Sequence, residues 1–69
     1  MTKKERQDLV REVAGLCVEI SNKDKDQIRR QLSYLQDRFN ELAARARAAN
    51  VHLEPYASDI QDKLNRVRR

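Results

Sequence analysis

Residues 25–49 read KDQIRRQLSYLQDRFNELAARARAA, and their apolar side chains recur at alternating spacings of four and three. The positions concerned are Ile28, Leu32, Leu35, Phe39, Leu42, Ala46 and Ala49. This heptad pattern is typical of a coiled-coil seam, because it places every apolar side chain on one stripe of an α-helix. Mostly polar and basic residues flank the stripe. The stretch therefore predicts one long helix, about 37 Å at a rise of 1.5 Å per residue.

The chain before this stretch predicts a first helix over residues 2–20. Thr2 followed by Glu5 has the spacing of a capping box, in which each side chain bonds the other residue's backbone N–H. The apolar stripe of this helix consists of Leu9, Val13, Leu16 and Ile20. Ser, Asn and Asp residues between the two helices favour a turn. We expect Asn22 to end the first helix in the left-handed conformation and Asp24 to cap the second.

The chain after residue 49 predicts a break and then a third helix over residues 55–67. Pro55 suits the first position of a helix, because the N–H that proline lacks has no partner there. The same four-three spacing continues through Leu53, Ala57, Ile60, Leu64 and Val67. Short connections make neighbouring helices antiparallel. Folding the third helix back then pairs Leu64 with Phe39 and Ile60 with Leu42.

These patterns predict the all-α class, in the form of a small three-helix antiparallel bundle with a long, coiled-coil-like central helix. A single domain is expected to cover residues 1–69, with its core centred on Leu35, Phe39 and Leu42. Chains of this length have little apolar surface to bury. We therefore expect the bundle to be oligomeric.

The composition argues against several classes of function. The chain has 69 residues, with one Cys, one His, one Gly and one Pro. A single Cys and a single His are too few for a metal site or a disulfide scaffold, and one Gly cannot build a phosphate-binding loop. The position of Cys17 on an apolar stripe indicates a buried hydrophobe rather than a nucleophile paired with His52. We expect no catalytic residue, no metal and no cofactor, and hence not an enzyme.

The sequence also predicts where the protein acts. No apolar run approaches the roughly 18 residues of a membrane span. The opening MTKKERQD lacks the apolar region of a secretory signal, and a lone cysteine fits a reducing compartment. We expect a cytoplasmic protein without a membrane span.

The first helix carries a second set of apolar positions beside its main stripe. This candidate partner interface consists of Val10, Ala14, Cys17 and Val18. The helix predicted over residues 25–49 cannot cover this second set alone. Burial of apolar area is worth roughly 25 cal/mol per Å², so covering it stabilises a complex. We therefore expect a homodimer or a complex with another protein. The predicted function is a non-catalytic protein–protein interaction module, such as a small regulator, co-chaperone or inhibitor, acting by helix packing.

The basic residues support an alternative function. Fifteen Lys and Arg residues against eleven Asp and Glu residues give a net charge of +4. The candidate basic patches are drawn from Lys3, Lys4, Arg29, Arg30, Arg45, Arg47, Arg66, Arg68 and Arg69. The antiparallel arrangement places the chain end near the middle of helix two, and the first lysines near Arg45 and Arg47. These patches could contact phosphates, so a nucleic-acid-binding regulator is the second hypothesis.

Overall fold

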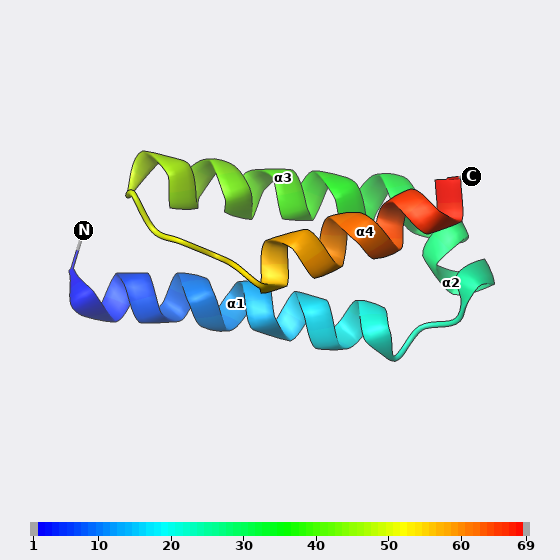
Figure 1. Cartoon of the computed structure of the whole chain (residues 1–69), viewed down its shortest axis with the longest axis horizontal. Helices are drawn as coiled ribbons and strands as arrows, with labels where there is room; N and C mark the ends of the chain where they lie inside the picture. The colour runs from blue at the N-terminus through cyan, green and yellow to red at the C-terminus, as the bar shows by residue number, and fades with distance from the viewer. Residues whose placement is uncertain (1, 69) are drawn as a thin grey trace.

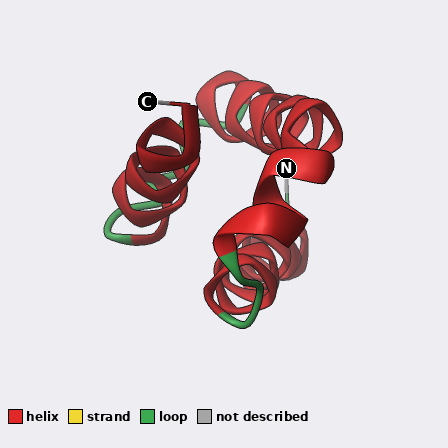
Figure 2. Cartoon of the chain, turned by 90° about the vertical axis from the view of Figure 1, so that its right-hand side faces the viewer, coloured by secondary structure: helices red, strands yellow, loops and turns green. Residues whose placement is uncertain are grey.

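Four α-helices make up most of residues 2–68, the part of the chain that the computed structural model describes. They are α1 (Lys3–Ser21), α2 (Lys25–Arg30), α3 (Leu32–Ala48) and α4 (Tyr56–Arg68). No strand occurs among these residues, so the predicted all-α class is confirmed. The three longer helices lie side by side in a body of 38 × 19 × 18 Å, and α2 crosses one end of it (Figures 1 and 2).

The start of α1 is held by the predicted capping box. The backbone N–H of Glu5 donates to the Thr2 hydroxyl at 3.2 Å, and the Thr2 N–H donates to the Glu5 carboxylate at 3.4 Å. Two N–H groups that the helix cannot pair internally are satisfied in this way. The helix therefore begins within one residue of the predicted position.

The turn after α1 differs from the prediction at Asn22. Asn22 has φ −88° and ψ −6°, which is right-handed, and its N–H donates to the carbonyls of Val18 and Glu19. The left-handed conformation is not needed here, because α2 begins almost at once. Asp24 does cap α2, accepting a hydrogen bond from the Gln27 N–H at 2.8 Å. The Asn22 prediction is thus wrong and the Asp24 prediction is confirmed.

The predicted helix over residues 25–49 is broken at Gln31, so the expected three helices become four. Gln31 has φ −107° and ψ 12°, outside the helical region. Its N–H still donates to the carbonyls of Gln27 and Ile28, so the backbone bends without leaving this donor unpaired. The bend turns α2 onto α4 as well as α3. We attribute it to the burial of Ile28, which is 6% exposed.

The end of α3 is a left-handed turn at Asn50, whose φ is 59°. The Asn50 N–H donates to the Arg47 carbonyl at 3.2 Å, and the Val51 N–H donates to the Ala46 carbonyl at 2.8 Å. This pair of bonds is a Schellman motif, which satisfies carbonyls that the helix end leaves free. The chain then continues through residues 51–55 to α4, and the peptide bond before Pro55 is cis.

The register of α4 on α3 corrects the predicted pairing of Leu64 with Phe39. The side-chain amides of Gln36 and Gln61 bond each other at 3.2 and 3.3 Å. Compared with the predicted pairing of Leu64 with Phe39, α4 therefore lies more than one helical turn closer to the start of α3. The cause is the segment 49–55, which runs back along the bundle instead of turning tightly (Figure 1). An extended chain covers about 3.3 Å per residue, so a segment of this kind is long enough to displace the start of α4 along the bundle.

α4 packs most extensively on α1, and the two helices run in the same direction, opposite to α3 (Figure 1). The Lys63 ammonium, in the middle of α4, donates to the hydroxyl of Ser21 at the end of α1. The sequence reasoning packed the third helix on the far half of the central helix, with at most partial cover of the first helix. The displaced register instead lets it cover α1 and α3 together.

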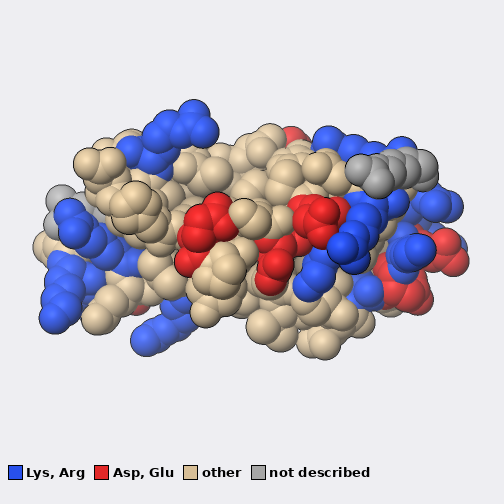
Figure 3. Space-filling view, in the orientation of Figure 1, with Lys and Arg blue, Asp and Glu red and all other residues tan. Residues whose placement is uncertain are grey.

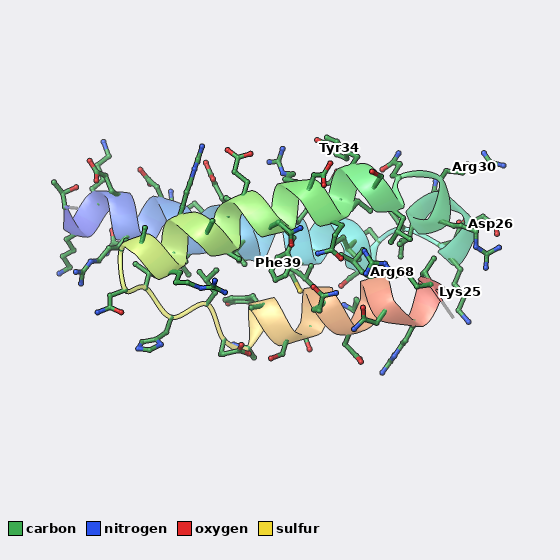
Figure 4. All side chains as sticks on the ribbon, turned by 90° about the horizontal axis from the view of Figure 1, so that it is seen from above. Lys25, Asp26, Arg30, Tyr34, Phe39 and Arg68 are labelled. Atoms are coloured by element: carbon green, nitrogen blue, oxygen red, sulfur yellow. The ribbon has the colours of Figure 1, made fainter. Side chains whose placement is uncertain are left out.

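A continuous core joins all four helices. Its members are Leu9, Val13, Leu16, Cys17, Ile20, Ile28, Leu35, Phe39, Leu42, Ala46, Leu53, Ile60, Leu64 and Val67. The predicted core centre is confirmed as buried, with Leu35 at 0%, Leu42 at 4% and Phe39 at 7% exposed. Figure 4 shows Phe39 on the side of α3 that faces α4. Leu53 fills the end of the bundle that α4 does not reach.

Candidate functional site

One line of apolar side chains along α1 stays outside the core. Val10 and Ala14 are half-buried, and Val18 is 59% exposed. Their spacing of four residues places them on one side of the helix. We call these three residues the α1 face. Val18 and Tyr34 are the large hydrophobic side chains left exposed in the described part of the chain.

Cys17, which was expected on the same face, belongs to the core instead. It is 8% exposed. It lies four residues after Val13, which is fully buried, so both side chains project from the same side of α1. The packing of α4 on α1 closes that side. A partner that binds the α1 face therefore does not meet the thiol.

An open groove of 560 Å³ lies where α1 meets the start of α4. Its lining residues are Arg6, Gln7, Val10, Arg11, Ala14 and Tyr56. Tyr56 is the first residue of α4 and is half-buried, as are Val10 and Ala14. We call this feature the α1–α4 groove. Its apolar part is continuous with the α1 face, so a ligand of that face would also enter the groove.

The charges of α1 are separated onto two edges. Arg6 and Arg11 line the α1–α4 groove, and its lining includes no Asp or Glu. Glu5, Asp8 and Glu12 instead line a second depression together with Arg45 of α3. The groove side of α1 is therefore basic and apolar at Arg6 and Arg11, whereas three carboxylates lie beside Arg45 on the α3 side. Arg6 also lines a shallow depression with Arg45, Ala48 and Ala49 of the α3 end.

The basic residues near the start of α1 have acidic side chains beside them. The Arg45 guanidinium bonds the Glu41 carboxylate at 2.7 Å, with both side chains more than half exposed. Arg45 also faces the carboxylates that line the depression described above. Lys3, Lys4 and Arg47 are exposed. Because several acids surround Arg45, positive potential at this end of the bundle is reduced.

A second group of basic residues gathers at the opposite end of the bundle. Figure 4 shows Lys25, Arg30 and Arg68 there, and Figure 3 shows Lys and Arg atoms at that end beside acidic ones. The Arg68 guanidinium donates to the Gln36 side chain at 2.8 Å, which holds the end of α4 against α3. Arg29 is exposed, and Arg66 bonds Asp62 at 2.9 Å. The predicted contribution of Arg69 lies outside the described residues.

Tyr34 is a surface feature that the sequence reasoning missed. It is 57% exposed on α3, and its hydroxyl accepts a hydrogen bond from Arg38 at 3.4 Å. The signal was its place directly before the seam residue Leu35, one position off the stripe. Aromatic side chains at such positions face solvent or a partner rather than the core.

The described residues hold no group of three or more His, Cys, Asp or Glu side chains arranged to bind a metal ion. Cys17 is buried and His52 is exposed. Within the same residues, no helix combines the length and the apolar character needed to cross a membrane. Comparison with protein families, curated proteins and solved structures found no match to this chain.

Proposed function

We propose that this protein is a non-catalytic protein-binding module that packs its α1 face against a helix of a partner. The observation that carries this proposal is the exposure of Val18, at 59%, in line with the half-buried Val10 and Ala14. Covering a valine fully is worth about 1.5–3 kcal/mol relative to leaving it in water. Because Val18 is 59% exposed, a partner that covers the α1 face recovers only the corresponding part of this free energy.

The proposed role is that of a small regulator, co-chaperone or inhibitor. Such a role requires a surface and a scaffold rather than a reacting group, and the bundle supplies both. The partner is another protein or a second copy of this chain. We place its action in the cytoplasm, because Cys17 is a free thiol and unpaired thiols persist in reducing compartments.

A photo-crosslinking amino acid at position 18 tests this function in the native host. The same amino acid at position 44 is the control, because Ala44 is an exposed apolar residue in the middle of α3. The captured protein is identified by mass spectrometry and then purified. We expect capture from position 18 but not from position 44.

Calorimetry with the purified partner completes the test. We expect Val18→Asp to weaken binding at least tenfold, and Ala44→Asp to leave the affinity unchanged. Equal capture from both positions, or binding that tolerates Val18→Asp, would show that the α1 face is not the interface.

Nucleic-acid binding is a second candidate function, supported by Lys25, Arg30 and Arg68 at one end of the bundle, where Asp26 lies as well (Figure 4). A few such charges support only weak binding, with dissociation constants of about 10⁻⁴–10⁻⁶ M at physiological salt. The absorbance ratio of the purified protein distinguishes the candidates cheaply. Co-purified nucleic acid that survives high salt would favour the second one.

A further inference from the structure

The floor of the α1–α4 groove is packed against the rest of the bundle. Val10 and Tyr56 pack against the hydrophobic core, and Ala14 follows Val13, which is fully buried. Tyr56 opens α4, so its backbone is held by both the helix and the core. An apolar side chain that enters the groove would therefore meet a surface formed in advance. Preformed surfaces lower the ordering cost of binding.

The rim of the groove is basic, so it favours a ligand with negative charge. Arg6 and Arg11 are both exposed and both line the groove, and none of the other lining residues is acidic. Guanidinium groups bind carboxylates through two parallel hydrogen bonds, which adds geometric specificity to charge attraction. Arginine and tyrosine are also the residue types most enriched where binding energy concentrates. An acidic ligand with an apolar centre is the chemical complement of this rim and floor.

We infer that the α1–α4 groove binds an acidic amphipathic helix of a partner protein, an inference that rests on the protein-binding function proposed above. From Val10 to Val18 the α1 face spans about 12 Å, at a rise of 1.5 Å per residue. A partner helix of two to three turns covers this length with apolar side chains at positions i, i+4 and i+7. Carboxylates beside that stripe reach Arg6 and Arg11.

A second copy of this chain does not fit the groove as well. Three of the four acidic residues of α1, which are Glu5, Asp8 and Glu12, lie on the α3 side of the helix. Bringing that edge to the groove of another copy joins two different surfaces. Such contacts are heterologous and extend into chains of molecules unless the rotation closes a ring. The charge arrangement therefore favours a different protein as the occupant.

Two synthetic helical peptides test the inference on the full chain, labelled with ¹⁵N. One peptide carries leucines at i, i+4 and i+7 with flanking glutamates, and its twin carries lysines in place of the glutamates. We expect the glutamate peptide to shift the backbone amides between Arg6 and Ala14 and that of Tyr56. Its affinity should exceed that of the lysine twin at least tenfold at low salt, and the difference should shrink as salt rises.

Charge reversal of the rim supplies the decisive variant. In Arg6→Glu/Arg11→Glu the preference should invert toward the lysine peptide. The matched control, Lys23→Glu/Arg38→Glu, changes the net charge equally away from the groove and should keep the glutamate preference. Circular dichroism checks that both variants remain helical.

The failures of the two proposals are distinguishable. Equal binding of both peptides at the α1 face, abolished by Val18→Asp, would overturn the acidic preference and leave the protein-binding function standing. Shifts confined to α2 and the end of α4 would overturn the groove as the site. A doubled mass in sedimentation, with the same amides shifted by unlabelled protein alone, would identify a second copy as the occupant and overturn the inference. Absence of binding by either peptide, together with an unchanged partner affinity in Val18→Asp, would refute both proposals.

Discussion

Asn50 ends α3 in the left-handed region, with φ 59°, where a side chain normally clashes with the backbone. The cost for an ordinary residue is about 1–2 kcal/mol, and asparagine reduces it by local hydrogen bonding. We expect Asn50→Ala to lower the free energy of unfolding by about 1 kcal/mol, and Asn50→Gly to match or exceed the parent. In a domain of this size, about 1 kcal/mol moves the thermal midpoint by about 4–8 °C. An alanine variant as stable as the parent would contradict the Schellman assignment.

Phe39 is the largest side chain of the core and is 7% exposed. Phe39→Ala should cost about 3–5 kcal/mol, because the cavity it leaves adds to the lost burial. Small domains have about 5–15 kcal/mol in total, so the variant should be mostly unfolded or molten at 37 °C. Tyr34→Ala on the same helix is the control and should change the thermal midpoint little, since Tyr34 is exposed. A thermal midpoint of Phe39→Ala within about two degrees of that of the parent would show that Phe39 is not packed in the core where the helices meet.

At the scale of the elements, α2 depends on its cap more than the longer helices do. It has six residues, and helices this short are unstable in isolation. Asp24 and Gln27 bond each other's backbone N–H groups at its start. We expect Asp24→Ala to destabilise the protein by about 1 kcal/mol, read as a lower urea midpoint. Asp26→Ala, in the same turn but outside the cap, should have a smaller effect, and equal effects would refute the capping role.

The outer helices show which element boundaries were predictable. α1 and α4 begin and end within one residue of their predicted limits, because Thr2, Glu5 and Pro55 act on the backbone next to them. The bend at Gln31 was not predictable in the same way. No Gly or Pro lies there, and we attribute the bend to the burial of Ile28, which depends on the packing of α2 against α3 and α4. The α1 face was partly predictable: Val10, Ala14 and Val18 lie on it, whereas Cys17 turned inward.

At the scale of the whole molecule, the distribution of charge limits nucleic-acid binding. We expect weak duplex binding without sequence preference, which disappears by about 200 mM salt because few phosphates are neutralised. A chain ending at Val67 should bind more weakly, and it should still fold because it keeps Val67, the last core residue, and loses only the exposed Arg68–Gln36 hydrogen bond. Fluorescence anisotropy over a salt series measures the first effect and circular dichroism the second. Nanomolar, salt-resistant binding to a defined DNA or RNA would instead promote the nucleic-acid function.

Residue order alone was enough to predict the helical class, the capping box of Thr2 and Glu5, the cap at Asp24 and the buried stripe through Leu35, Phe39 and Leu42. These features depend on neighbours within one or two turns, so spacing alone reveals them. The bend at Gln31, the position of Gln61 beside Gln36 and the α1–α4 groove depend on segments far apart in the chain. The last two follow from the path of residues 49–55, which carries α4 along the bundle before it packs (Figure 1), whereas the bend at Gln31 goes with the burial of Ile28. Only the folded chain brings Tyr56 to Arg6 and Arg11, because no sequence spacing encodes how far that segment extends.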